Sequence, residues 1–225
     1  MKAMVLAAGR GERLRPLTDT VPKPLVPLAG RMLIEYHLEK LARAGIGEVV
    51  INLSWLGERI REALGTGARY GLQIHYSEEG PVPLETGGGI ARALALLGTE
   101  PFLVVNADVW TDLDFAALGP LPAEAHASIV LAPNPEHHPQ GDFALSGDVV
   151  LEQGETRLTY TGIGIYRPEF FAGCPEGRFA LLPLLRRAIA AGQLRGQVYR
   201  GEWFDVGSPQ RLAWLDAHVR ARAAN

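Results

Sequence analysis

Glycine and positive charge are concentrated near the N-terminus, in the segment "LAAGRGERLRPLT" at positions 6–18. It follows an apolar run, and in it Gly9 and Gly11 stand beside Glu12 and Arg13. Glycine lets successive backbone N–H groups turn toward an anion and leaves room for phosphate oxygens to approach. A loop of this kind after a first strand is the expected ligand site of an open α/β sheet. The segment therefore predicts a site for the phosphates of a nucleotide.

The spacing of these glycines does not match the two most familiar phosphate loops. There is no G-x-x-x-x-G-K-[ST] sequence, and in the G-x-G-x-x-G register the sixth position is Leu14. A dinucleotide fold also needs an acidic residue after its second strand, whereas "EVVINLS" ends in Asn, Leu and Ser. Arg13 and Lys23, which is held between Pro22 and Pro24, supply positive charge. A nucleoside triphosphate therefore fits better than a dinucleotide.

Two aspartates stand where short apolar runs end, Asp108 in "FLVVNADVW" and Asp205 in "GEWFDVGSP". Strand ends converge at one edge of an open sheet, so these carboxylates can meet although they are distant in the sequence. Carboxylate oxygens are the ligands that Mg²⁺ prefers, and phosphoryl or nucleotidyl transfer depends mainly on positioning and charge neutralisation. Taken alone, each aspartate could equally be a turn or helix-cap residue.

A third motif, "VPLETGGGI", places three glycines, Gly87 to Gly89, at the start of a helical segment. Each glycine costs a helix about 1 kcal/mol relative to alanine, so helix stability alone does not explain them. Either a bound group approaches this backbone closely, or the glycines allow close packing of the helix. The sequence leaves both possibilities open.

Around these motifs, short apolar runs alternate with helix-period segments, a pattern typical of a mostly parallel sheet with helices on both faces. The predicted strands are residues 3–7, 48–53, 72–76, 102–106 and 128–132. Three helices are predicted. The first has Ile34 and Leu38 on its inner face and ends at Gly45, the second begins after Ser54 as its N-cap, and the third covers residues 88–97. The sequence therefore predicts an α/β, Rossmann-like fold.

The alternation ends at about residue 132, and the turn-rich sequence that follows predicts a small β-rich lid. After the lid we expect a helix in "ALLPLLRRAIAAG", a strand in "QVYRGEWFDV" and a closing helix with Ser208 and Pro209 at its start. The expected organisation is one domain, residues 1–225, made of a nucleotide-binding core (1–132), a sugar-binding lid (about 133–167) and closing helices (168–225).

Composition argues against several classes of protein. A formal net charge of -3 argues against broad nucleic-acid binding, which depends on clustered Lys and Arg. No apolar run reaches the roughly 20 residues of a membrane span, and the N-terminus lacks a signal-peptide core. The single cysteine, Cys174, excludes an internal disulfide and fits a reducing compartment. We therefore expect a cytoplasmic protein that binds no nucleic acid, no membrane and no obligate protein partner.

Taken together, the motifs resemble those of the sugar-1-phosphate nucleotidyltransferases. "LAAGRGERLRPLT" followed by "PKPLVPLAGRMLIEY" is similar to the N-terminal signature of that family, and "LETGGGIARAL" to its second nucleotide segment. Within the family, the compact length and "VNADVWTD" with "NPEHHPQGDF" most resemble the bacterial N-acetylmuramate-1-phosphate uridylyltransferases. The resemblance implies a GT-A-like nucleotidyltransferase fold and Mg²⁺ as cofactor.

Roles for particular residues follow from the loop chemistry and from this resemblance. The residues expected to hold the phosphates are Gly9, Gly11, Glu12, Arg13 and Lys23, and those expected to act in catalysis are Arg13, Lys23 and Asp108. The resemblance implies that Mg²⁺ is bound by Asp108 and Asp205, and the base by Gly80, Glu85, Thr86 and Gly87. Where Glu85 stands the family more commonly has glycine, which leaves side-chain roles in this segment open. Candidates for the sugar phosphate are Asn106, Gly141, Asp142, Thr161 and Gly162.

The resemblance implies a reaction of UTP with N-acetylmuramate 1-phosphate that gives UDP-N-acetylmuramate and pyrophosphate, as in peptidoglycan recycling. Mannose-1-phosphate guanylyl, glucose-1-phosphate thymidylyl or uridylyl, and phosphocholine cytidylyl transfer use similar motifs. A non-catalytic nucleotide-sugar sensor on the same fold is a different class of function. It would not need the full set of Arg13, Lys23, Asp108 and Asp205, which favours an enzyme. The adjacent His137 and His138 are more typical of a solvated loop than of a metal site.

Overall fold

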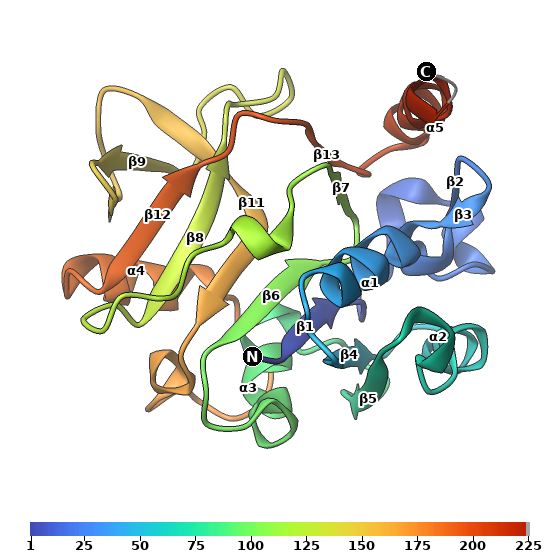
Figure 1. The fold of residues 1–225 in the computed structure, drawn as a ribbon, viewed down its shortest axis with the longest axis horizontal. Helices are drawn as coiled ribbons and strands as arrows, with labels where there is room; N and C mark the ends of the chain where they lie inside the picture. The colour runs from blue at the N-terminus through green and yellow to red at the C-terminus, as the bar shows by residue number, and fades with distance from the viewer. Residues whose placement is uncertain (224–225) are drawn as a thin grey trace.

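The computed structural model describes residues 1–223, whose strands form one nine-stranded sheet and two small two-stranded sheets (Figure 1). The nine strands lie in the order β5-β4-β1-β6-β11-β8-β12-β10-β9. Their bounds are Ala3–Leu6 (β1), Glu48–Leu53 (β4), Gln73–Glu78 (β5), Phe102–Asn106 (β6), Ala127–Ala132 (β8), Phe143–Ser146 (β9), Val149–Leu151 (β10), Arg157–Tyr166 (β11) and Leu194–Val198 (β12). The five strands predicted before position 133 are confirmed, each with ends within two residues of the prediction.

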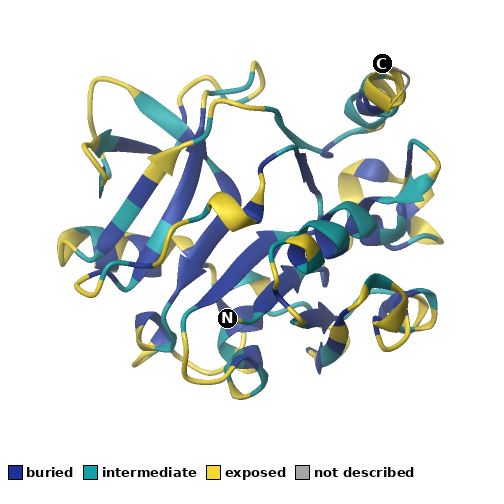
Figure 2. Cartoon of the chain, in the orientation of Figure 1, coloured by how far each residue is buried: buried dark blue, intermediate teal, exposed yellow. Residues whose placement is uncertain are grey.

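Four neighbouring strands, β5, β4, β1 and β6, run parallel and bring their carboxyl ends to one edge of the sheet. β1 lies between β4 and β6, with Ala3 opposite Val49 on one side and Leu103 on the other. These three strands are almost entirely buried, as a sheet covered on both faces requires (Figure 2). The loops that follow β1, β4 and β6 therefore begin side by side.

Helices cover both faces of this parallel part. On one face lie α1 (Leu33–Arg43) and α2 (Gly57–Leu64), where Ile34 and Leu38 pack in the cluster that holds Val5. On the other lies α3 (Glu85–Leu97), in the cluster that holds Met4. α4 (Leu182–Ala190) adds to the same cluster farther along the sheet, next to β12. Met4 and Val5 reach opposite clusters because side chains alternate along a strand. Gly45, with φ +75, ends α1 as predicted.

Two of the predicted helix starts are wrong, and a third is confirmed. The Ser54 hydroxyl donates to the Gly80 carbonyl at 2.8 Å, and α2 begins only at Gly57. α3 begins at Glu85, before the predicted Gly88. Ser208 does cap the closing helix α5 (Pro209–Ala223), since its Oγ accepts a hydrogen bond from the Arg211 N–H at 3.2 Å.

The β-rich segment expected at residues 133–167 forms strands, but they complete the main sheet and do not form a separate lid. β11 lies between β6 and β8 and is antiparallel to both, and the β9–β10 hairpin lies beyond β12, with β9 also pairing with β11. The sheet is therefore mixed: its four strands on the β5 side are parallel, β12 is parallel to β8, and the other pairs are antiparallel. The register of β11 shifts between Tyr160 and Gly164, next to the end of β6.

Two short sheets and α5 enclose a third apolar cluster. β7 (Val109–Thr111) pairs with β13 (Trp203–Asp205), and β2 (Pro27–Leu28) pairs with β3 (Arg31–Met32). Leu14, Trp110 and Leu215 are buried together here. The strand predicted in "QVYRGEWFDV" is thus two strands in different sheets, the end of β12 and β13. Short 3₁₀ helices lie at Glu12–Leu14, Leu17–Asp19, Lys23–Leu25, Ala68–Tyr70, Phe115–Ala117 and Pro168–Phe171.

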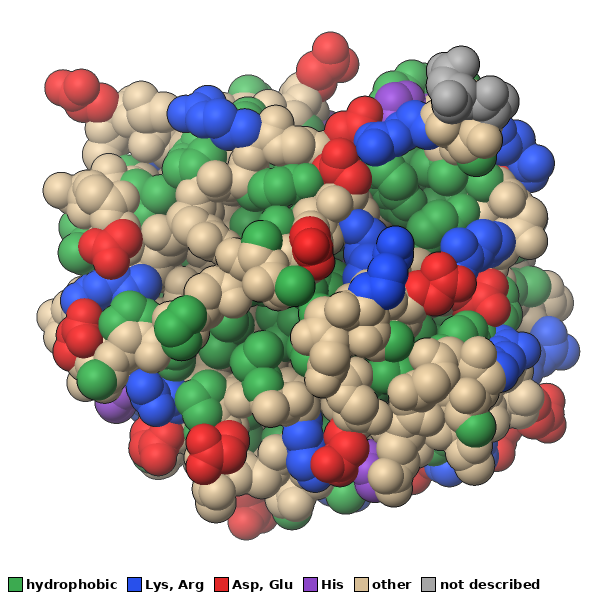
Figure 3. Space-filling model, in the orientation of Figure 1, with side chains coloured by type: hydrophobic (Ala, Val, Ile, Leu, Met, Phe, Trp, Pro, Cys, Tyr) green, Lys and Arg blue, Asp and Glu red, His purple; other side chains and the backbone are tan. Residues whose placement is uncertain are grey.

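The surface carries charges of both signs. On the face shown in Figure 3, Lys and Arg side chains lie among Asp and Glu side chains and do not gather in one broad patch. Within residues 1–223, no helix combines the length and the apolar character that crossing a membrane would require.

Candidate active site

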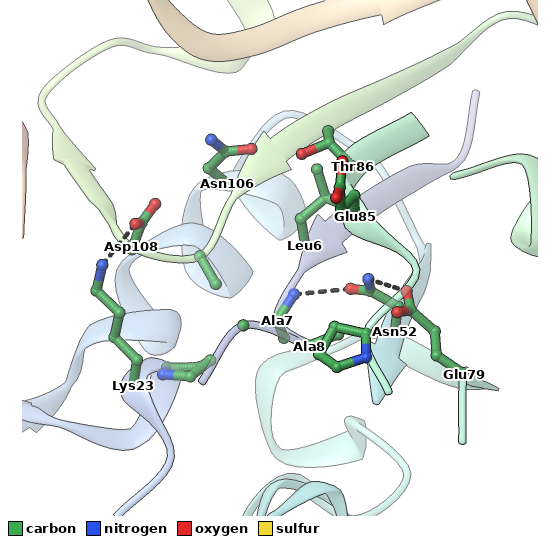
Figure 4. Close-up of a pocket in the computed structure, with 14 residues that line it drawn as sticks. Leu6, Ala7, Ala8, Lys23, Asn52, Glu79, Glu85, Thr86, Asn106 and Asp108 are labelled. Atoms are coloured by element: carbon green, nitrogen blue, oxygen red, sulfur yellow. Dashed lines mark hydrogen bonds and ion pairs between the residues drawn. The ribbon is translucent and has the colours of Figure 1, made fainter. Parts of the chain in front are cut away.

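Two adjoining cavities open at the carboxyl ends of the parallel strands. One, of about 200 Å³, lies between the ends of β1, β4 and β6 and the start of α3 (Figure 4). The other, of about 620 Å³, lies over the loop after β1. Residues that line both are Gly9, Lys23, Pro83, Glu85 and Asp108. The first cavity adds Asn52, Glu79, Thr86 and Asn106, and the second adds Gly11, Glu12, Arg13 and Arg178.

In the loop after β1, the two glycines have different tasks. Gly11 has φ +65, and a Cβ there would lie 2.9 Å from Cγ2 of Thr18, whose hydroxyl donates to the Gly11 carbonyl at 2.8 Å. Leu14, 1% exposed, anchors the end of the loop in the third apolar cluster. Above Gly9, by contrast, no other atom lies within 4 Å of a Cβ position. Gly11 therefore shapes the turn, and Gly9 leaves space that a phosphate can enter.

Lys23 reaches across the mouth of both cavities to Asp108. Its Nζ lies 2.5 Å from the Asp108 Oδ2, and Lys23 is only 9% exposed (Figure 4). Pro22 and Pro24 flank Lys23 at the start of a 3₁₀ helix, which restricts the backbone that carries the ammonium. The structure thus brings together the lysine of the N-terminal motif and the aspartate that follows β6.

Asp205 is joined to Asp108 through the small β7–β13 sheet. Asp205 lies opposite Val109, and the Val206 N–H donates to the Asp108 carbonyl at 2.8 Å. The Asp205 Oδ1 lies 2.5 Å from Nη1 of Arg211 and 3.1 Å from Nε2 of His137. Asp108, directly before β7, and Asp205, at the end of β13, are therefore neighbours, and each is paired with a cationic side chain.

A buried polar network that the sequence reasoning missed holds the ends of β1 and β4 together. Oδ1 of Asn52 accepts from the Ala7 N–H at 2.7 Å, and Nδ2 donates to Oε1 of Glu79 at 2.6 Å (Figure 4). Oε2 of Glu79 accepts from the Leu84 N–H at 2.7 Å. The signal was present, because an asparagine near the end of an apolar strand needs a partner when it is buried.

With this geometry in place, comparison with known proteins identifies the family. Residues 2–141 match the family model described as nucleotidyl transferase. The chain belongs to the nucleotidyl transferase family. It is 52% identical over 220 residues to the N-acetylmuramate alpha-1-phosphate uridylyltransferase of Neisseria meningitidis serogroup B, covering 94% of this chain and 95% of that one. The protein of the same name from Caulobacter vibrioides is 40% identical, with 96% of each chain covered.

Solved structures confirm the predicted nucleotidyltransferase fold. A candidate glucose-1-phosphate thymidylyltransferase from Bacillus anthracis, in complex with sucrose, superposes with a TM-score of 0.85 at 20% identity, covering 98% of this chain and 95% of that one. HddC from Yersinia pseudotuberculosis superposes with a TM-score of 0.80 at 21% identity, covering 97% and 99%. At such identities the likeness concerns the fold alone.

In this nucleotidyl transferase, Asp108 and Asp205 supply the donor type that Mg²⁺ prefers. Each carboxylate is paired with a cationic side chain, Asp108 with Lys23 and Asp205 with Arg211, so each lies where a positive charge is bound. Among residues 1–223, no three His, Cys, Asp or Glu side chains come close enough to hold a metal ion by themselves. The residues therefore fit an ion that substrate phosphates help to coordinate.

The three glycines at the start of α3 face other parts of the protein. A Cβ on Gly87 would lie 2.6 Å from the Phe179 ring, and one on Gly88 would lie closer than 3.0 Å to the Gly177 carbonyl oxygen. A Cβ on Gly89 would collide with the Glu79 carboxylate. Of the two possibilities that the sequence left open, close packing of the helix accounts for all three glycines.

Glu85 begins α3 in a backbone conformation that favours glycine. Its φ is +62, and its carboxylate pairs with Nε of Arg178 at 2.8 Å beside the larger cavity. Glycine adopts a left-handed φ more easily than glutamate does, so the backbone here fits the glycine that the family resemblance leads us to expect. Thr86 lines the smaller cavity, whereas Gly80, φ +84, and Gly87 line neither.

The sugar-phosphate candidates are divided between the cavity and the sheet. Asn106 lines the smaller cavity, and a Cβ on Gly162 would lie 2.5 Å from the Asn106 Nδ2, so the glycine makes room for the asparagine. Thr161 is 1% exposed, and its hydroxyl donates to the Val130 carbonyl at 2.8 Å. Its side chain therefore stabilises the irregular part of β11 and does not face the cavity.

Gly141 and Asp142 hold the loop before β9 against β11. Oδ2 of Asp142 accepts from the Tyr160 N–H at 2.8 Å, and its Oδ1 lies 3.0 Å from Nε2 of His138. Gly141 has φ +61 and packs against the Asn134 side chain. Neither residue lines the two cavities, so the structure gives both a role in shaping the loop.

His37 of α1 is a buried ring that no motif pointed to. Its Nε2–H donates to the Val109 carbonyl at 2.7 Å, and its Nδ1 has no partner among the described residues. Burial lowers the pKa of this imidazole to about 4, although the Val109 hydrogen bond and the charge of Asp108 oppose the shift. The neutral ring holds β7 directly after Asp108.

Proposed function

We propose that the chain is a cytoplasmic uridylyltransferase that joins UTP and N-acetylmuramate α-1-phosphate to form UDP-N-acetylmuramate and pyrophosphate. The observation that carries the proposal is 52% identity, over nearly the whole of both chains, to a protein of that name. The product is a nucleotide sugar of the cell wall, which is consistent with a role in peptidoglycan recycling. Lys23, Asp108 and Asp205, placed together at the strand ends, support an active enzyme over a sensor.

Different residues of the site bind the phosphates, neutralise charge and hold the metal ion in the proposed reaction. Backbone N–H groups of the loop at residues 9–13 and the guanidinium of Arg13 would hold the β- and γ-phosphates over the larger cavity. The Lys23 ammonium can turn from Asp108 to the phosphate on which negative charge develops. When bound, Mg²⁺ would be held by Asp108 and Asp205 and would neutralise charge on both reacting phosphates. A sugar-phosphate oxygen would attack the α-phosphorus in line, and pyrophosphate would leave toward Arg13.

On the base side, the Asn52–Glu79 network fixes the floor of the smaller cavity. It joins the end of β1, the end of β4 and the Leu84 N–H before α3. We assign the base to this cavity, with Thr86 and the backbone near Glu85 within its wall. A rigid floor favours recognition by fixed backbone groups, since ordering costs are then met during folding.

The test is pyrophosphate release by the purified protein with Mg²⁺, with each nucleoside triphosphate paired with a panel of sugar 1-phosphates. Release with UTP and N-acetylmuramate 1-phosphate, and with other pairs at least 100-fold more slowly, is the expected result. Faster release with GTP and mannose 1-phosphate, or with dTTP and glucose 1-phosphate, would reassign the substrates. Nucleotide binding with no release from any pair would favour the sensor.

A further inference from the structure

Arg211 stands where three separate segments meet beside the active site. Its Nη1 lies 2.5 Å from Oδ1 of Asp205 in β13 and 2.7 Å from Nε2 of His137 in the loop before β9. The side chains of Arg211 and His137 are 30% and 43% exposed. His137 lies in an exposed loop, as the sequence predicts, and its ring also contacts Arg211. This contact ties the loop to the first turn of α5.

The direction of the proposed reaction places the sugar on this side of the site. Pyrophosphate would leave over the loop at residues 9–13, and in-line attack puts the incoming phosphate on the opposite side of the α-phosphorus. In the proposed function we assign that side to Asp205, which binds Mg²⁺ there, and to its neighbours on β13. The ring attached to the attacking phosphate therefore extends toward the segment that carries His137 and Arg211.

N-acetylmuramate differs from N-acetylglucosamine by a lactyl ether that ends in a carboxylate, which is ionised at neutral pH. A guanidinium presents paired donors that match the two oxygens of a carboxylate. Among the described residues, Arg211 has one anionic partner, Asp205, which in the proposed function also binds Mg²⁺. When Asp205 is shared with a divalent cation, its attraction for Arg211 is weakened, and the lactyl carboxylate can supply a second anion for the guanidinium.

Other arginines on the β11 side of the sheet are used to hold the fold. Nη2 of Arg157 donates to the Asp142 carbonyl at 2.6 Å, and Nε of Arg167 donates to the Ala125 carbonyl at 2.9 Å. Arg211 differs from them, because its described partners are two side chains that can rearrange. We propose that Arg211, with His137 beside it, binds the lactyl carboxylate and thereby selects the muramate sugar, an inference that rests on the proposed function.

The experiment compares two substrates in matched variants. We would measure kcat/KM with N-acetylmuramate 1-phosphate and with N-acetylglucosamine 1-phosphate, at saturating UTP and Mg²⁺, for the wild type, Arg211→Gln and His137→Gln. Arg220→Gln is the control, since Arg220 lies on the same helix and pairs with Asp216. Arg211→Gln is expected to lower the preference for the muramate sugar about 10- to 100-fold, the effect of a charge-assisted pair. His137→Gln should lower it less, and Arg220→Gln should leave it unchanged.

The outcomes separate this inference from the proposed function. Equal losses with both sugars in Arg211→Gln would mean that the arginine serves the shared phosphate or Asp205, and would overturn the inference. A wild type that uses both sugars equally well would also overturn it, because no lactyl recognition would then exist. If the wild type releases pyrophosphate only with an unrelated sugar, the proposed function itself fails. Retained turnover of N-acetylglucosamine 1-phosphate by Arg211→Gln shows that the variant is folded. Arg211→Lys keeps the positive charge but not the planar guanidinium, and it should restore only part of the preference for the muramate sugar.

Discussion

Replacing Gly88 by alanine tests whether packing explains the glycines of α3. The new Cβ would lie closer than 3.0 Å to the Gly177 carbonyl oxygen, a backbone atom that cannot move aside as a side chain can. The Gly88 N–H also donates to the Phe179 carbonyl at 3.0 Å, so a shift of this segment strains that hydrogen bond. Overpacking costs about 1–3 kcal/mol and a weakened hydrogen bond about 1, whereas alanine gains about 1 in helix propensity. We expect a net loss of about 2 kcal/mol of unfolding free energy.

Urea unfolding of Gly88→Ala and Gly9→Ala, together with the KM for UTP, separates the two explanations. Gly9→Ala is the control because its Cβ meets no atom within 4 Å and its φ lies outside the left-handed region. It should change stability by less than about 0.5 kcal/mol and raise the KM for UTP, since it fills space left for a phosphate. Gly88→Ala should lower the stability and leave the KM for UTP unchanged. Unchanged stability with a raised KM for UTP in Gly88→Ala would refute the packing explanation.

Substitutions at three further positions test other parts of the site. Glu85→Gly should be about 1 kcal/mol more stable to urea than Glu85→Ala, because only glycine adopts a φ of +62 without strain. Both variants lose the exposed pair with Arg178, so that loss cancels in the comparison. Equal stabilities would contradict this explanation. The pKa of His37, about 4 in the fold, lies below the roughly 6.5 of an unfolded histidine, so the unfolded state binds the proton first as the pH falls. Between about pH 6.5 and 4 the wild type should therefore lose up to about 3 kcal/mol more stability than His37→Gln, and parallel stability curves would argue against a buried neutral ring. Asp108→Asn should lower pyrophosphate release at least about 100-fold. It should remain folded, since the amide oxygen still accepts from Lys23, and near-normal turnover would remove Asp108 from the metal site.

Local patterns predicted the parallel part of the fold well. β1, β4 and β6 are continuous apolar runs because both of their faces are covered, and such runs are recognisable without tertiary information. The loop after β1 was recognisable for the same reason, because Gly9 and Gly11 follow a buried strand directly. The proximity of this loop to Asp108 could be expected, because the carboxyl ends of parallel strands lie at one edge of the sheet.

Pairings between distant segments were not predictable from local pattern. The sequence of β11 predicts only one more short strand, and its pairing with β6 and β8 is what shows that it completes the sheet. Ser54 has the residue type of a helix cap, yet its hydroxyl donates to Gly80, which follows another strand. In the sequence, Asn52 only argues against a dinucleotide site, because its partner Glu79 lies beyond the next strand. In each case the deciding partner is far away in sequence, and propensity carries no information about it.

Three acids around the site are each paired with a cationic side chain. Asp108 is paired with Lys23, Asp205 with Arg211, and Glu85 with Arg178. Such pairing avoids leaving a partly buried charge without a partner, which is costly. In the proposed function, Mg²⁺ held by Asp108 and Asp205 would neutralise these two acids, and Lys23 and Arg211 would then be able to pair with anionic groups of the substrates.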